Sequence, residues 1–248
     1  MKFLLAPLLV ITCSSLMPAS AQDDRNAKLA PWQQDYLNLP QDRREEFKKH
    51  LSKASELFKQ KRIFETIDEL NAAENIFDDS PEVETLYGAC QVEFRAFDKA
   101  MEHFERANAL TPGNGSVLFN IGEVYFVQKR WDDAQKAFER VLLLLDADDQ
   151  FAMTRLTQFK ILLCMIKLGK PDEARKLVDK YDILDDSPYP YYAEAAMAYH
   201  DGDELKAEAA LARAARIFRQ EAILAPWKDT LMEFGYIKSF YGGDIEEP

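Results

Sequence analysis

Residues 118–126 read LFNIGEVYF, and residues 131–138 read WDDAQKAF. Gly122 and Ala134 are small enough to let two helices approach closely, whereas Phe138 is bulky enough to fill the space between them. Asp132 and Asp133 fall where the first turn of the second helix begins, and a helix dipole favours negative charge there. The two segments predict a helical hairpin, which must stack on a neighbour because it cannot bury its apolar stripe alone.

The hairpin pattern recurs along the chain. Three positions repeat at one constant spacing, which pairs Gly88 with Gly122, Ala100 with Ala134, and Phe104 with Phe138. The turn motif extends the series, and its fourth residue is Ile67, Ala100, Ala134, Ala174 and Ala207, at nearly even steps except for a longer one between Ala134 and Ala174. The series predicts five hairpins over residues 48–221, with an extra turn or two of helix around residues 149–154.

These residues resemble the tetratricopeptide repeat. The resemblance includes the first-helix leucine (Leu118), the small Gly122, the tyrosine (Tyr125), the turn aromatic (Trp131) and the second-helix alanine (Ala134). It implies an all-α fold, a right-handed superhelical solenoid of about five helical hairpins. In this family the first helices line a concave groove, and that groove typically holds a peptide or helix from a partner protein.

The groove positions that the resemblance implies are apolar and aromatic. The candidates for partner binding are Phe119, Glu123, Phe126, Phe159, Leu163, Tyr192 and Tyr199. Family members that hold an acidic C-terminal peptide carry Lys, Asn and Arg there, but only Lys167 is basic near this groove. The composition therefore favours an apolar partner segment with some Lys or Arg. In the alternative interpretation, the C-terminal helix or the segment around Trp32 fills the groove permanently.

Two flanking regions complete the predicted domain organisation. Residues 22–47 form a linker and the start of the first helix, loose except for an amphipathic patch at Trp32, Tyr36 and Leu37. Residues 222–248 form a capping helix and a frayed acidic tail. Because terminal repeats need a cover, this helix is expected to shield the apolar side of the fifth hairpin, including Leu205 and Leu211.

Residues 1–21 have the pattern of a removable export signal. Lys2 precedes an apolar run that is too short to span a membrane, and residues 19–21 read ASA, a small-x-small cleavage pattern. Cys13 follows Thr12, whereas a lipoprotein cleavage box requires Gly, Ala or Ser there, which disfavours a lipid anchor. The pattern predicts an exported bacterial protein, periplasmic or secreted, with no transmembrane segment.

Composition narrows the function classes. The chain has 47% apolar residues and nine glycines, which favours a globular protein over a disordered one. Asp and Glu number 43 against 31 Lys and Arg, a formal net charge of -12. A field of this sign repels phosphate backbones, so nucleic acid is not an expected partner.

The sequence shows no constellation typical of an enzyme or a metal site. His50, His103 and His200 fall in three different repeats, and no two of them have ligand spacing on one helix. No phosphate-binding glycine loop or nucleophile elbow is present, so no cofactor, metal or catalytic activity is expected. Asp201 beside His200 is interpreted as a cap of the next helix. Cys90 and Cys164 occupy equivalent slots two repeats apart, too distant for a disulfide.

The sequence therefore predicts a protein–protein interaction scaffold of the periplasm or cell envelope, whose partner is an unidentified protein or peptide. The alternative is a structural subunit, or lipoprotein-like factor, of an outer-membrane or envelope assembly complex. Such a subunit would work by edge-on association and not by peptide capture. Lipidation of Cys13 would favour this alternative.

Overall fold

The computed structural model describes residues 29–145, 150–182 and 184–237, and every regular element in these ranges is an α-helix. The all-α fold predicted from the sequence is confirmed, and the order of the helices fits a solenoid of helical hairpins. The predicted export signal, Cys13 and the acidic tail after Ile237 lie outside the described residues.

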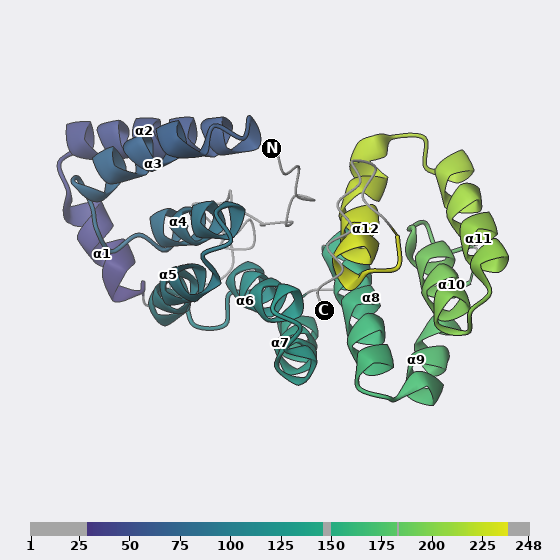
Figure 1. Ribbon diagram of the computed structural model, residues 1–248. Coiled ribbons are helices and arrows are strands. Elements are labelled where there is room, and N and C mark those ends of the chain that lie inside the picture. Colours follow the sequence, from purple (N-terminus) through teal and green to yellow (C-terminus); the bar gives the residue numbers. More distant parts are fainter. Residues whose placement is uncertain (1–28, 146–149, 183, 238–248) are drawn as a thin grey trace. The chain divides into compact units, whose positions relative to one another are not determined.

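The described ranges contain twelve helices, most of them the first or second helix of a hairpin (Figure 1). Their bounds are α1 Pro31–Asn38, α2 Gln41–Lys59, α3 Ile63–Glu74, α4 Pro81–Glu93, α5 Phe97–Leu110, α6 Gly115–Val127, α7 Trp131–Leu144, α8 Phe151–Lys167, α9 Pro171–Val178, α10 Tyr189–His200, α11 Glu204–Ile217 and α12 Glu221–Phe234. In chain order, α2 to α11 form five successive helix pairs, with α1 before them and α12 after them.

The chain divides into two compact units, and the division falls inside α6, after Val124. In the N-terminal unit, α2 packs on α3, α3 on α4, and α4 on α5. In the C-terminal unit, α8 contacts α7, α9, α10 and α12, and α10 also packs on α11. Within each unit, consecutive helices therefore bury their apolar faces against their neighbours in the chain.

The turns inside the five hairpins fix the register of the repeats. One residue in each turn has a positive φ, and these residues are Lys61, Arg95, Lys129, Gly169 and Gly202. Each second helix begins two residues later, so Ile63, and not Phe64, opens α3. Thr66, which is fully buried, therefore occupies the slot that Ala100 fills in the next repeat. The sequence-based assignment of Ile67 to this slot is wrong by one residue, because α3 begins at Ile63 and its fourth residue is Thr66.

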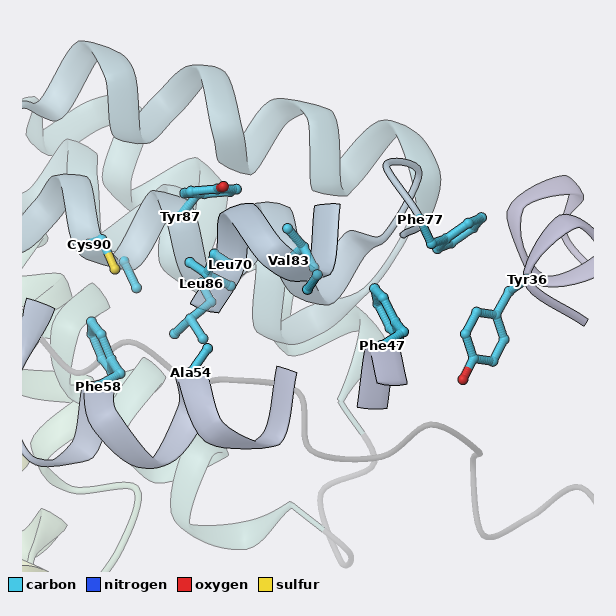
Figure 2. Packing of buried hydrophobic residues seen from close by; sticks show 12 residues of the cluster. Tyr36, Phe47, Ala54, Phe58, Leu70, Phe77, Val83, Leu86, Tyr87 and Cys90 are labelled. Carbon is cyan, nitrogen blue, oxygen red and sulfur yellow. The ribbon is translucent and has the colours of Figure 1, made fainter. Parts of the chain in front are cut away.

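The core of the N-terminal unit ends in three aromatic rings. The Tyr36 ring centroid lies 5.5 Å from that of Phe47 and 5.6 Å from that of Phe77. Figure 2 shows these rings together at one end of the cluster, with Phe58 and Cys90 towards the other end. Tyr36 thus anchors α1, and the amphipathic patch predicted inside a loose segment forms a helix.

Gly88 of α4 marks a close approach between the two helices of the second hairpin. A Cβ atom at this position would lie 2.5 Å from a carbon of the Phe104 ring on α5. Phe104 is fully buried, so its ring has little freedom to move away. The interpretation of Gly88 as the small residue that permits this packing is confirmed.

The longer spacing between Ala134 and Ala174, in the third and fourth repeats, is explained by the length of one helix. Helix α8 has 17 residues, whereas α4 and α6 have 13 each. At about 3.6 residues per turn, the difference is about one turn of helix. The extra turn that the longer step predicted is therefore present in α8, which begins at Phe151.

Helix α12 does not cover the side of the fifth hairpin that the sequence predicted. Leu205 is 87% exposed and Leu211 is only partly buried. The ring of Trp227 in α12 instead lies 5.6 Å from that of Tyr192 in α10. The outward face of α11 consists largely of Ala and charged residues, which offer little apolar area. The aromatic side of α8 and α10 offers more apolar area to bury, so α12 packs there.

Candidate functional site

The predicted groove side of the C-terminal unit is occupied by α12, which lies beside α8 (Figure 1). Trp227 of α12 is 4% exposed. Its ring centroid lies 5.3 Å from Phe159 of α8, and 5.6 Å and 6.4 Å from Tyr192 and Tyr189 of α10. The indole is therefore enclosed by rings from two first helices of the repeat array.

A second set of rings continues this packing at the C-terminal end of α12. The Phe234 ring centroid lies 6.2 Å from Phe126 and 5.6 Å from Trp131. Tyr236, just beyond the helix, stacks on Tyr199 at 5.3 Å. Aromatic contacts of this kind add about 0.5–1.5 kcal/mol each beyond the area that they bury. The groove side of this unit thus carries two sets of packed aromatic rings, one around Trp227 and one around Phe234.

The sequence of α12 explains why it takes this position. Its buried residues Leu224, Trp227, Leu231 and Phe234 are 2%, 4%, 0% and 5% exposed, and their three- and four-residue spacing makes one apolar stripe. The helix ends at Gly235, whose φ of 90° lies in the left-handed region that glycine adopts readily. The stripe was visible in the sequence and could have identified α12 as a groove occupant.

Two lysines face the aromatic core. Lys160 Nζ lies 4.6 Å from the centroid of the Phe126 ring, and Lys167 Nζ lies 4.6 Å from that of Phe234. Both distances are within the range of cation–π attraction. Lys160 is 1% exposed, although the sequence pattern predicts only Lys167 as a basic residue near the groove. The long apolar helix around Lys160 was the available signal of its burial.

The seven predicted groove residues are mostly interior. Phe119, Glu123, Phe126, Phe159, Leu163 and Tyr192 are at most 1% exposed, and Tyr199 is partly buried. The Tyr199 hydroxyl donates a hydrogen bond to Glu208 Oε1 at 2.5 Å. In the C-terminal unit, the chain's own helix thus fills the side where a partner was expected. This arrangement is the alternative that the sequence left open.

A cavity of 280 Å³ lies on the fifth hairpin. It is lined by Pro190, Tyr191, Glu194, Arg213, Arg216 and Ile217. The carboxylate of Glu194 is held in an ion pair by Arg213, and none of these described lining residues carries a thiol, serine hydroxyl or imidazole.

Two histidines connect the helices of the first two hairpins. His50 Nδ1 lies 2.7 Å from Glu69 Oε2, and His103 Nδ1 lies 2.7 Å from Glu84 Oε2. The two pairs are offset by one repeat, with the histidine on the first helix in one hairpin and on the second helix in the other. Among the residues that the structure describes, no three His, Cys, Asp or Glu side chains gather as a metal site would require.

The residues near His200 are engaged in structural contacts. Asp201 accepts two hydrogen bonds from Arg175, at 3.0 Å and 2.7 Å, and this contact lowers the pKa of its carboxyl group. Asp203 caps α11 by accepting a hydrogen bond from the Lys206 N–H at 3.0 Å. The interpretation of Asp201 as the cap is therefore wrong, because Asp203 stands directly before the helix.

Cys90 and Cys164 are buried, and both are free thiols among the residues that the structure describes. Burial raises the pKa of the Cys90 thiol to about 12, so it is protonated and unreactive at neutral pH. Within residues 29–145, 150–182 and 184–237, no helix combines the length and the apolar character that crossing a membrane would require.

Comparisons with known proteins agree with this architecture. Residues 91–156, which include α5, α6 and α7, match the family model of the tetratricopeptide repeat. The chain is also similar to a solved structure of PilF from Pseudomonas aeruginosa, with a TM-score of 0.57 and 16% sequence identity over 79% of this chain and 94% of that one. A likeness at this identity shows the fold alone. No curated protein matches the sequence.

Proposed function

We propose that this protein is a protein–protein interaction scaffold of the bacterial cell envelope, exported through its N-terminal segment. The observation that carries the proposal is the run of helical hairpins, of which residues 91–156 match the tetratricopeptide repeat. Arrays of such repeats present extended surfaces that suit protein partners. The signal-like pattern of residues 1–21 supports export, and the net charge of -12 disfavours nucleic acid as the partner.

Two modes of partner binding differ in what they require of α12. Capture of a partner helix in the C-terminal unit would require α12 to leave, and four large apolar side chains of α12 are buried there. Burial of one large apolar side chain stabilises by about 1.5–3 kcal/mol, so a competing helix would have to replace several such contributions. The second mode is that of a structural subunit, which associates through its exposed edges and leaves α12 in place. Occupancy of the groove side by α12 therefore favours this second mode.

Crosslinking in living cells tests the scaffold proposal. A photo-crosslinking amino acid is placed at the exposed positions Leu143 and Leu184, which are 86% and 85% exposed, and at buried Phe159 as the control. A scaffold yields the same discrete partner bands from an exposed position in repeated experiments, and none from Phe159. The absence of any band above the control from positions across the exposed surface would contradict the proposal.

Export is tested separately. Cell fractionation should place the protein in the periplasm or medium, and intact mass should correspond to a chain that begins near Gln22. A mass that includes a lipid on Cys13 would show an envelope-anchored factor instead. A protein retained in the cytoplasm at full length would contradict the envelope part of the proposal.

A further inference from the structure

One position at the start of each second helix is acidic in the middle hairpins and apolar in the first and last hairpins. The second residue of the second helix is Asp98, Asp132 and Asp172 in the three middle hairpins, and each is exposed. The same position is Phe64 in the first hairpin and Leu205 in the last, and these side chains are 74% and 87% exposed. An aspartate there is favoured by the helix dipole, whereas an exposed Phe or Leu brings no such benefit.

The tip of the first hairpin combines exposed rings with positive charge. We define the first tip as residues 59–65, which carry Lys59, Lys61, Arg62 and a single carboxylate, Glu65. The Phe64 ring lies 5.4 Å from that of Phe94, which is itself 43% exposed. The first tip therefore presents an aromatic pair among cationic side chains.

The corresponding tip of the last hairpin has the opposite charge. We define the last tip as residues 200–206, which carry Asp201, Asp203, Glu204 and a single lysine, Lys206. Leu205 projects from this acidic turn. The two tips occupy equivalent turns of their hairpins. Each tip combines an exposed apolar side chain with charged residues, which are mainly cationic in the first tip and mainly anionic in the last tip.

Several of these charges are available for a partner. Lys61 and Arg62 already bind Glu93 and Glu65, and Arg175 binds Asp201. In contrast, Lys59, Arg95 near the first tip, and Glu204 at the last tip form no ion pair within the part of the chain that the structure describes. Each tip thus retains charge that can pair across an interface.

We propose that the first tip of one copy of this protein binds the last tip of a second copy, in a head-to-tail contact. Phe64 and Phe94 would pack on Leu205, and cations of the first tip would face the carboxylates of the last. The proposal rests on the proposed function, because it identifies a partner for an edge-binding scaffold. A contact between two different surfaces is heterologous, so it builds rings or open chains of copies.

A second copy is the favoured occupant because this chain itself supplies both complementary surfaces. The exposed patches are small, so the contact belongs to the class of weak and reversible interfaces. Attraction between exposed charges is screened by salt, so association should weaken as ionic strength rises. A different protein with an acidic and aliphatic surface is an outcome that the experiment distinguishes.

Two substitutions test the contact without disturbing the fold. Phe64→Asp and Leu205→Asp each introduce the residue that the middle hairpins carry at this position. Leu184→Asp is the matched control, because Leu184 is 85% exposed and lies in neither tip. Sedimentation velocity at increasing concentrations of purified protein should show association of the unaltered protein and of the control. Each tip variant should associate about tenfold or more weakly.

Mixing the two variants identifies the type of contact. The Phe64→Asp protein retains an intact last tip, and the Leu205→Asp protein retains an intact first tip. An equal mixture should therefore form dimers and no larger species at concentrations where neither variant associates alone. Circular dichroism must show equal helicity for all four proteins.

Three outcomes would overturn the inference. They are an unaltered protein that stays monomeric at every concentration and in low salt, single variants that associate as the unaltered protein does, and a mixture that stays monomeric. If the unaltered protein is monomeric while crosslinks from Leu184 or Leu143 still identify another protein, the scaffold proposal stands and only self-association fails. If copies associate but no other protein crosslinks, only the self-association is supported.

Discussion

At the scale of single residues, Gly88 shows how one missing side chain sets the distance between two helices. Gly88→Ala would place a Cβ atom 2.5 Å from the fully buried Phe104 ring. Overpacking of a core costs about 1–3 kcal/mol, so we expect a loss of unfolding free energy in this range, measured by urea denaturation. Gly202→Ala is the control, because its Cβ would meet nothing within 4 Å and its cost comes only from its φ of +80°.

The two glycines separate packing from backbone strain. A core variant that restores space, Gly88→Ala combined with Phe104→Leu, should recover part of the loss. Recovery is not expected when Phe104→Leu is combined with Gly202→Ala. Equal stability of the Gly88→Ala and parent proteins would show that the helices can separate at no cost.

Glu69 makes stability depend on pH. Lys53 Nζ donates a hydrogen bond to Oε1 at 2.5 Å and His50 Nδ1 lies 2.7 Å from Oε2, and these contacts lower the pKa of the Glu69 carboxyl group in that order of importance. A carboxyl pKa lowered by folding stabilises the protein fully above the unfolded pKa of about 4.3, and this contribution is lost as pH falls through the lower folded value.

The expected result is that Glu69→Gln destabilises the protein near neutral pH and that the difference from the parent shrinks as pH falls below about 4. Urea denaturation at several pH values measures this difference. Asp68→Asn is the matched control, because Asp68 is an exposed neighbour on the same helix. A difference that does not change with pH would mean that the contacts do not favour the ionised form.

At the scale of elements, α12 is the helix whose role the structure changes most. Trp227→Ala removes an indole enclosed by Phe159, Tyr189 and Tyr192. Truncation of a buried Trp costs about 3–5 kcal/mol, so we expect a clear fall in melting temperature and a loss of near-ultraviolet circular dichroism. Ile223→Ala, on the same helix at a 40% exposed position, should have a small effect.

The same packing changes what substitution of the predicted groove residues should do. Phe126 is 1% exposed, so Phe126→Ala is expected to destabilise the fold instead of only weakening partner capture. Tyr199 is partly buried and its hydroxyl binds Glu208, so its loss should cost less. A Phe126→Ala protein with unchanged melting would show that the contacts of this ring with Phe138 and Phe234 contribute little to stability.

At the scale of the whole molecule, the division into two units predicts local effects. Gly88→Ala should raise hydrogen exchange mainly in α4 and α5, and Trp227→Ala mainly in α8 and α10. The reason is that solenoid stability is close to a sum of repeats and the interfaces between neighbours. Exchange measured by mass spectrometry on peptides from each unit tests this expectation. A uniform rise along the chain in both variants would indicate a single cooperative unit.

The helical hairpins could be predicted from the amino-acid sequence, because the signals for them are local. Gly88, Ala134 and the acids in the first turns follow helix geometry and recur at a regular spacing, so they can be read without knowing any long-range contact. The one error of register, at Ile67, came from a turn in which two apolar residues stand side by side. Either Ile63 or Phe64 could open the second helix, and the positive φ of Lys61 shows that α3 begins at Ile63.

Which apolar surfaces are covered could not be predicted, because it depends on contacts between residues far apart in the chain. The same aromatic positions are consistent with an open groove and with a filled one, because both give identical periodicity along α8 and α10. The choice depends on α12, whose Trp227 is separated from Phe159 by three intervening helices in the chain yet packs against it. The exposure of Phe64 and Leu205 could not be predicted from the sequence either. A hydrophobic residue in a repeat is buried or exposed according to the neighbours that the fold brings to it.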